Sequence, residues 1–338
     1  MMTAPVDNGI EWSGFAIDNP WTFDLETAKL ILKHCPIYST RNNPAYQGLV
    51  TIVPNAQQTV IDRSDVVNPC GYTQTCAELD AANWDSVPLL IVAHGQCEWT
   101  RKSLAVSLSK GTKHILASVS TGGVKCFPED VQDRVGVIYN GIDFSRCAPA
   151  VDRETTRKKW GIESGTKAVG YIGRFAYGKK PLVVAEAVTE LGDGYHAVYV
   201  GEGNQQDQVI EDVKERCGDR VTIIPRTEDV GTVLAALDCM VSASPSEGGP
   251  LSVIESWIAG CPVVSTSVGI IPELEAEHGP LTNVIPFDPS PQELADAVRE
   301  AIGDKTRIER AKKLAWKLFP STRMLLDYEA LFRGSHAG

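Results

Sequence analysis

Two glutamates and a pair of glycines stand close together in the segment 244–260 (SPSEGGPLSVIESWIAG). Carboxylates accept hydrogen bonds from hydroxyl groups, so Glu247 and Glu255 suit the binding of a sugar or a ribose. Gly248 and Gly249 give the backbone the freedom to turn and to approach a ligand. The competing interpretation is an ordinary acidic bias near a helix N-terminus together with one solvated glutamate. The Gly-Gly-Pro context favours the binding site.

The residues after these glycines predict a helix whose N-terminus faces a ligand. Pro250 suits the first helical position, because its missing N–H would have no partner there. Leu251, Ile254 and Ile258 recur at helical spacing and predict the buried stripe of this helix. Its first backbone N–H groups carry partial positive charge, which favours a phosphate. The whole segment therefore predicts a site for a phosphorylated ligand that carries hydroxyl groups.

A second group of candidate residues follows a predicted strand at residues 168–172. Gly173 lets the backbone turn there, and Arg174 offers a planar guanidinium group for phosphate oxygens. Lys179 and Lys180 come a few residues later, and a lysine in this place adds a point charge. On its own, the pattern is also typical of a solvated basic loop.

Two further glycines, Gly201 and Gly203, follow a predicted strand at residues 197–200. They permit close approach of the backbone to a ligand, although many Gly-x-Gly pairs are plain turns. The pattern is not the fingerprint of dinucleotide binding, because the third glycine is missing. A nicotinamide-dependent oxidoreductase needs that fingerprint after an early strand, and the sequence holds none, which argues against that class.

All three groups follow predicted strands in a chain that alternates strands with helices, the pattern of an α/β fold with parallel sheets. Turn residues at 140–150 separate two such units. We therefore expect a first domain over residues 1–147, a second over 148–318 and a C-terminal helix at 319–338, for which a return to the first domain is one arrangement. Ligands of parallel sheets bind beyond the carboxyl ends of the strands, so two units would face each other across a cleft. The expected strands are residues 49–54, 88–94, 114–120 and 135–139, then 168–172, 197–200, 221–224, 239–243, 262–266 and 284–286.

The composition of the 338-residue chain narrows the function further. Its net charge of −11 leaves it without the basic surface that nucleic-acid-binding proteins need. Its nine cysteines form no Cys-x-x-Cys pair, so we expect reduced thiols and no metal site. The N-terminal residues lack the pattern of a signal peptide, and no run of about 18 apolar residues is present. We therefore expect a cytoplasmic protein.

One stretch, residues 100–127, departs from the overall charge. It holds five basic residues and no acidic one: Arg101, Lys102, Lys110, Lys113 and Lys125. The cluster fits a surface for an anionic acceptor or for a lipid membrane, or simply the solvated flank of a helix. The solvated flank is the commoner outcome for such runs.

Taken together, the motifs resemble those of the retaining glycosyltransferases of GT-B fold, in particular family 4. Glu247 and Glu255 match the Glu-x7-Glu element of that family. Residues 259–266 (AGCPVVST) resemble the strand entry that follows it, and residues 267–273 (SVGIIPE) resemble its V-G-G-x-P-E loop. In that loop Ile270 replaces the second glycine.

The same family has a G-R-x4-K grip on the donor phosphates, which residues 173–179 resemble. The spacing to the following helix selects Lys179 over Lys180 as its lysine. Residues 199–203 (YVGEG) resemble the donor-side glycine loop, and residues 138–143 (IYNGID) resemble the N-G-[VI]-D segment before the linker. The resemblance extends from about residue 135 to residue 290.

This resemblance implies two Rossmann-like domains facing a cleft, with a first domain that is shortened or atypical. It implies a UDP- or GDP-sugar donor held mainly by the second domain, with no metal and no cofactor. The sugar would move to an acceptor with retention of the anomeric configuration. The acceptor, whether a glycan, a lipid-linked molecule or a small molecule, is not assigned.

The resemblance also implies roles for single residues. Arg174, Lys179 and the helix N–H groups after Gly249 would stabilise the diphosphate, Glu255 would hold the ribose, and Glu247 would lie near the anomeric centre. His94, after the strand at 88–94, would contact the sugar or the acceptor from the first domain, unless it is a structural histidine. The donor-binding residues would be Gly173, Gly201, Gly203, Arg226, Gly248, Gly249, Pro250, Leu251 and Glu255, with Arg226 near the base.

One alternative function remains at this point. The atypical first half also fits a GT-B-like protein that binds a nucleotide sugar without transferring it. Release of free nucleotide together with sugar on an acceptor separates the two.

Overall fold

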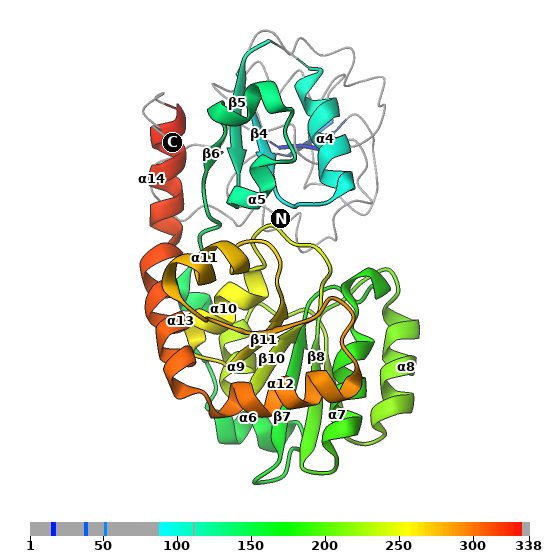
Figure 1. Ribbon diagram of the computed structural model, residues 1–338. Coiled ribbons are helices and arrows are strands. Elements are labelled where there is room, and N and C mark those ends of the chain that lie inside the picture. Colours follow the sequence, from blue (N-terminus) through cyan, green and yellow to red (C-terminus); the bar gives the residue numbers. More distant parts are fainter. Residues whose placement is uncertain (1–14, 18–36, 40–50, 53–87, 111, 333–338) are drawn as a thin grey trace.

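The computed structural model describes residues 15–17, 37–39, 51–52, 88–110 and 112–332. Within them the chain forms two α/β units, and the last helix lies beside the first unit (Figure 1). The α/β fold that the alternation of strands and helices predicts is confirmed. In the described part of the chain, every helix is too short or too polar to cross a lipid bilayer.

A six-stranded parallel sheet forms the centre of the second domain, with the strand order β12-β11-β10-β7-β8-β9. The order reverses between β7 and β10, so the loops after these two strands lie next to each other at the carboxyl edge of the sheet. The strands are β7 (Lys167–Ile172), β8 (Tyr195–Val200), β9 (Val221–Ile224), β10 (Cys239–Ser242), β11 (Val263–Thr266) and β12 (Asn283–Ile285).

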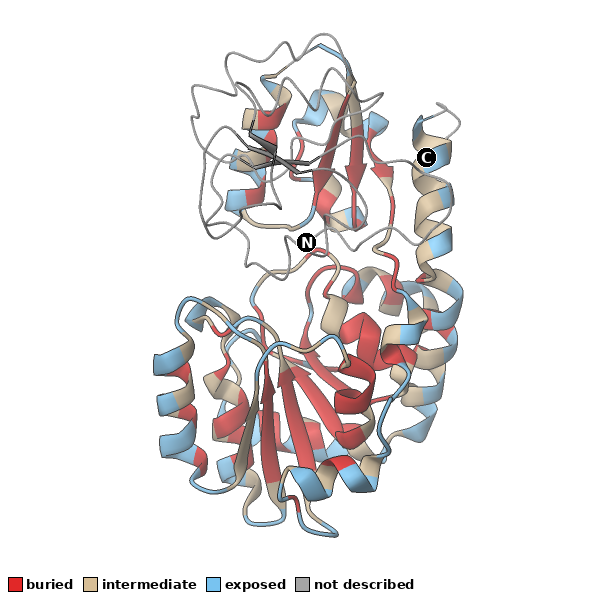
Figure 2. Cartoon of the chain, turned by 180° about the vertical axis from the view of Figure 1, so that it is seen from behind, coloured by how far each residue is buried: buried red, intermediate tan, exposed pale blue. Residues whose placement is uncertain are grey.

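Helices cover both faces of this sheet, because its central strands are buried on both sides. One face packs against α7 (Leu182–Leu191), α8 (Gln206–Cys217) and α12 (Pro291–Gly303). The other packs against α9 (Val230–Ala236), α10 (Leu251–Ala259), α11 (Ile271–His278) and α13 (Lys305–Leu318). Figure 2 shows the buried residues concentrated in the sheet and on the inner sides of these helices.

The first domain contains two small parallel sheets. One consists of β4 (Leu89–Ala93), β5 (His114–Ser118) and β6 (Gly136–Val137), with α4 (Glu98–Leu108) and α5 (Thr121–Val124) in the connections. The other consists of β1 (Phe15–Ile17), β2 (Ile37–Ser39) and β3 (Thr51–Ile52). The expected strand at 49–54 contains β3, and the one at 135–139 contains the shorter β6. The rest of the expected first domain before residue 88 lies outside the described residues.

Two chain segments lie side by side where the domains join. The Ile142 N–H donates to the Phe319 carbonyl oxygen at 2.8 Å, and the Ser321 N–H donates back to the Ile142 carbonyl oxygen at 3.1 Å. Gly141 has no room for a side chain, because a Cβ atom there would lie 2.6 Å from the Cα atom of Ser321. The two crossings between the domains are therefore joined by a short piece of parallel pairing.

The last helix, α14 (Ser321–Phe332), returns to the first domain after the second crossing. Its residues Tyr328 and Leu331 pack against the apolar cluster of β4 and β5. In the other direction, Ile142 already belongs to the core of the second domain, before the boundary that the sequence predicts at residue 148.

Asp238 binds several basic side chains at the edge of the sheet where β7 and β10 begin. Its carboxylate accepts the Ala168 N–H at 2.8 Å and the Arg157 guanidinium at 3.1 Å, and it pairs with Arg153 at 2.9 Å and Lys167 at 3.6 Å. The side chains of Asp238 and Arg157 are each only 11% exposed. The cluster therefore ties α6 (Arg153–Lys159) to the starts of β7 and β10.

Replacing Asp238 by asparagine is expected to lower the free energy of unfolding by about 3 kcal/mol, because buried arginine charge loses its partner. Urea denaturation followed by circular dichroism measures the change. Asp296→Asn is the matched control, since Asp296 pairs with Arg299 on the exposed surface of α12. We expect it to change the stability by less than about 0.5 kcal/mol. Equal effects of the two variants would show that the cluster does not stabilise the domain.

Candidate functional site

Lys179 and Glu247 lie together beyond the carboxyl edge of the sheet. The Lys179 ammonium is 2.6 Å from a Glu247 carboxylate oxygen and 3.3 Å from the Ser244 hydroxyl oxygen. Both side chains are about a quarter exposed, at 27% and 24%. They meet because Lys179 follows β7 and Glu247 follows β10, the two strands at which the sheet order reverses.

The neighbouring lysine points elsewhere. Lys180 has a left-handed backbone with φ of 51°. Its ammonium contacts the Phe287 carbonyl oxygen at 2.5 Å and pairs with Asp288 at 3.1 Å, in the loop after β12. Of the two lysines, the structure thus brings Lys179 to the predicted site.

The loops that follow β7 and β8 pack directly on each other. Gly201 has φ of 146°, and a Cβ atom there would overlap the carbonyl oxygen of Gly173. A Cβ atom on Gly203 would overlap the Phe175 carbonyl oxygen. The Phe175 N–H donates to the Glu202 carbonyl oxygen at 2.9 Å, which locks the two loops together. Packing of backbone on backbone therefore accounts for both glycines.

Arg174 stands on the locked loop with its side chain exposed. Its carbonyl oxygen accepts the Tyr171 hydroxyl at 2.7 Å, so the backbone on both sides of the residue is fixed. An exposed guanidinium on a rigid loop suits an incoming phosphate, because little of the loop must be ordered on binding.

The predicted helix after the glycines is α10, and one detail of the prediction is wrong. Pro250 is the residue before the helix, with φ of −67° and ψ of 102°, and Leu251 is the first helical residue. The missing proline N–H is harmless at this position too, since helix hydrogen bonds begin later. The first of them run from Val253 and Ile254 to the Pro250 carbonyl oxygen, each 3.1 Å long.

The loop of Glu247 also touches the first domain. A Cβ atom on Gly248 would overlap the His94 carbonyl oxygen, and one on Gly249 would lie 2.7 Å from the Asn140 side-chain nitrogen. The Asn140 amide donates to the Gly249 carbonyl oxygen at 3.1 Å. His94 itself follows β4; although part of the residue is exposed, burial of its imidazole lowers the pKa to about 4, so the ring is neutral at pH 7. The structure therefore brings the backbone of His94 against the Glu247 loop.

Glu255 lies on α10 and is buried, with 7% of its surface exposed. Burial raises its pKa to about 7, although the Arg146 guanidinium, 3.5 Å from the carboxylate, opposes the shift. Arg146 also pairs with Glu228 at 3.0 Å, and the charge of Glu228 adds to the upward shift. This carboxylate therefore changes its charge near neutral pH.

Glu255, Arg146 and Glu228 form a row of charges, and Arg226 extends this row. It lies 3.6 Å from Glu202 in the glycine loop and 3.6 Å from Glu228. Acidic and basic side chains thus alternate from α10 to the loop after β8. Arg226 joins the row on the side of the glycine loop, close to the predicted donor residues Gly201 and Gly203.

Sequence reasoning missed two residues that contact this site. Arg146 carries no signal in the sequence, because its partner Glu255 is more than a hundred positions away. Gln96 bridges the Ser120 hydroxyl at 3.0 Å and the Gly269 carbonyl oxygen at 3.4 Å. Its position two residues after His94 is a usable signal, since residues after parallel strands face ligands.

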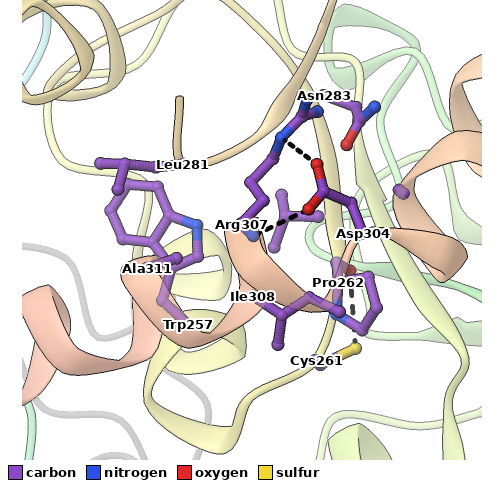
Figure 3. Close-up of a pocket in the computed structure, with 11 residues that line it drawn as sticks. Trp257, Cys261, Pro262, Leu281, Asn283, Asp304, Arg307, Ile308 and Ala311 are labelled. Atoms are coloured by element: carbon purple, nitrogen blue, oxygen red, sulfur yellow. Dashed lines mark hydrogen bonds and ion pairs between the residues drawn. The ribbon is translucent and has the colours of Figure 1, made fainter. Parts of the chain in front are cut away.

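A small pocket lies elsewhere in the second domain, between α10, β11 and α13 (Figure 3). Trp257, Asn283 and Arg307 line it, and Asp304 accepts the Arg307 N–H at 2.9 Å. None of the predicted site residues lines it. It therefore belongs to the packing of α13 on the sheet.

One protein family matches most of the second domain. The family described as glycosyl transferases group 1 matches residues 152–317. This range contains both loops of the carboxyl edge, α10 and Glu255. Among the predicted site residues, His94 alone lies outside it.

Curated relatives match at the level of distant homology. A D-inositol 3-phosphate glycosyltransferase of Mycobacteroides abscessus is 27% identical over 222 residues, which are 60% of this chain and 49% of that protein. A putative teichuronic acid biosynthesis glycosyltransferase, TuaC of Bacillus subtilis, is 31% identical over 163 residues, or 48% of this chain and 40% of that protein. The chain spans about half the length of the curated relatives it matches.

Among solved structures, HepE of Anabaena in complex with UDP-glucose superimposes with a TM-score of 0.71 at 18% identity, covering 95% of this chain and 99% of HepE. WaaG, a glycosyltransferase involved in lipopolysaccharide biosynthesis, gives a TM-score of 0.62 at 16% identity, covering 94% of this chain and 99% of WaaG. At these identities the likeness shows the fold. The chain thus has the GT-B fold, and its residues 152–317 match the family of glycosyl transferases group 1.

Proposed function

We propose that the protein is a glycosyltransferase that moves a sugar from a nucleoside diphosphate sugar to an acceptor, with retention of the anomeric configuration and without a metal. The observation that carries the proposal is the pair of Lys179 and Glu247 in the loops before α10, inside the segment that matches the family, with Arg174 exposed on the loop after β7. HepE structures contain UDP, UDP-glucose, or UDP with glucose, which favours UDP over GDP as the nucleotide.

In the proposed reaction the bond between the anomeric carbon and the diphosphate oxygen breaks, and its electron pair stays on the diphosphate. Arg174, Lys179 and the first N–H groups of α10 stabilise that negative charge. An acceptor hydroxyl forms the new bond on the face that the diphosphate leaves, and its proton passes to a diphosphate oxygen. Glu247 holds sugar hydroxyls beside the carbon that becomes positive.

Recognition of the nucleoside is assigned to the row of charges. Glu255 accepts hydrogen bonds from the ribose hydroxyls, and Arg226 lies near the base. Gly201 and Gly203 keep the loop after β8 close to the sheet edge, because side chains there would collide with the loop after β7.

A donor screen tests the proposal. The protein is incubated with UDP- and GDP-sugars and a panel of acceptors; released nucleotide is measured, and the anomeric configuration of the product is read by NMR. We expect release from UDP-sugars, and Arg174→Ala is expected to lower it about a hundredfold. Arg299→Ala on α12 is the control. Binding of UDP without release from any donor would instead support a nucleotide-sugar binding protein.

The affinity for UDP is expected to rise with pH through about 7. Glu255 accepts hydroxyl hydrogen bonds much more strongly when ionised, and one pH unit below its pKa about a tenth of it is ionised. Calorimetric titration at about pH 6 and pH 8 should therefore show a roughly tenfold difference. UDP titrates as well, so Glu255→Gln supplies the control for that effect. An equal pH dependence in both proteins would contradict the role of Glu255.

A further inference from the structure

A carboxylate of the second domain reaches α5 of the first domain. Glu273 lies on α11, and one of its oxygens accepts the Thr121 backbone N–H at 2.8 Å. The Thr121 hydroxyl donates to the same oxygen. Both bonds lie at the exposed rim of the interface between the domains. The bonded oxygen, Oε2, is thus open to solvent, whereas the other oxygen, Oε1, is buried and has no hydrogen-bond partner among the described residues.

The same stretch of the second domain meets the loop of His94. Gln96, two residues after His94, donates to the Gly269 carbonyl oxygen at 3.4 Å and to the Ser120 hydroxyl at 3.0 Å. Ser120 is the cap of α5 and directly precedes Thr121. Gln96 and Thr121 thus hold the two ends of the segment 269–273 against the first domain.

Backbone contacts connect the segment 269–273 to the candidate site. Gly269 has φ of 60°, and a Cβ atom there would overlap the Gly248 carbonyl oxygen. A Cβ atom on Gly248 would in turn overlap the His94 carbonyl oxygen. Three loops, one from the first domain and two from the second, are therefore stacked without side chains between them. Glu247 is the residue next to the middle layer of this stack.

Glu273 is the charged group at the end of the stack. Among the described residues, no lysine or arginine forms an ion pair with Glu273. Tyr139 faces it from the segment after β6, and burial together with the Glu273 charge raises the pKa of that tyrosine. Charge-assisted hydrogen bonds from Thr121 are thus its main compensation, and they form only when the two domains meet.

From this arrangement we propose that Glu273 is a positioning residue. Its bonds to Thr121 set the domains in the arrangement that places the His94 loop against the Glu247 loop. In this scheme Glu273 contacts neither donor nor acceptor, and it acts through the three stacked loops.

The inference rests on the proposed transfer reaction. Its test therefore measures kcat, which requires turnover, and also the UDP affinity and the radius of gyration, which do not. Glu273→Ala is expected to lower kcat about tenfold while the Kd for UDP stays within about twofold, because the donor residues are untouched. Small-angle scattering should show a larger radius of gyration for this variant. Glu277→Ala, one turn further along the exposed side of α11, is the matched control and should change none of the three. Glu273→Gln should restore part of the loss, since its carbonyl oxygen still accepts both bonds.

Two results would overturn the inference. One is a Glu273→Ala protein with the kcat and the radius of gyration of Glu277→Ala. The other is a loss of UDP affinity as large as the loss of kcat, which would mean direct contact with the donor. If the wild-type protein releases nucleotide from no donor, the proposed function fails, and the scattering comparison still decides whether Glu273 joins the domains.

Discussion

Replacing Glu247 by glutamine is expected to lower kcat by about two to three orders of magnitude. The anomeric carbon gains positive charge as its bond to the diphosphate breaks, and a carboxylate beside it stabilises that charge. The carboxylate lies 2.6 Å from the ammonium of Lys179, the cation to which the proposed function assigns the diphosphate. Glutamine keeps the shape and the hydrogen-bonding oxygen but removes the charge, so the UDP affinity should change little.

Initial rates with saturating donor, and calorimetry with UDP, measure the two quantities separately. The control is Glu186→Gln on α7, because Glu186 pairs with Arg216 on the outer surface at 3.8 Å. A Glu247→Gln protein with the turnover of the control would remove Glu247 from the mechanism. A loss confined to UDP affinity would move it from the sugar to the nucleotide.

The second large effect is expected for Gly201→Ala, in stability as well as in activity. A methyl group here must overlap the Gly173 carbonyl oxygen, and φ of 146° is a strained angle for alanine. Overpacking and backbone strain together should cost about 3 kcal/mol or more in the free energy of unfolding. Because the loop of Arg174 is pushed away, donor turnover should fall about a hundredfold.

Gly192→Ala separates these two causes. Gly192 ends α7 with φ of 86°, and no atom lies within 4 Å of where its Cβ atom would be. With ψ of −166°, Gly192 lies in a region that essentially only glycine adopts, so this variant suffers strain without the collision, and we expect it to cost about 2 kcal/mol. Thermal unfolding of both variants measures the difference. Equal losses would mean that the two loops can separate and that their packing is unimportant.

The sequence predicts the second domain well because its structure follows from local patterns. The runs at 168–172, 197–200 and 239–243 are short, apolar and followed by turn residues, and each corresponds to a strand of the parallel sheet. The loops after such strands gather at one edge by the rules of parallel sheets. The proximity of Lys179 and Glu247 follows from these rules, although the residues are 68 positions apart.

Contacts of charged side chains with residues of distant elements could not be predicted in this way. Arg146 meets Glu255, and Thr121 meets Glu273 across 152 positions. Neither pair follows from periodicity or from strand order, because each depends on how one domain or linker is oriented against the other. The position of Pro250 was missed for a different reason, since proline is tolerated both before a helix and in its first turn.

The paired crossings at Ile142 and Phe319 have a consequence for protein engineering. The first domain consists of two separate pieces of chain, because α14 packs on β4 and β5 after the second domain is complete. An exchange of the first domain between relatives must therefore transplant the N-terminal segment and α14 as one unit. A chimera joined only near Ile142 would place a foreign helix against the apolar face of β4 and β5. Joining at both Ile142 and Pro320 keeps that face and its helix from the same parent, and the junctions fall where the two segments already pair.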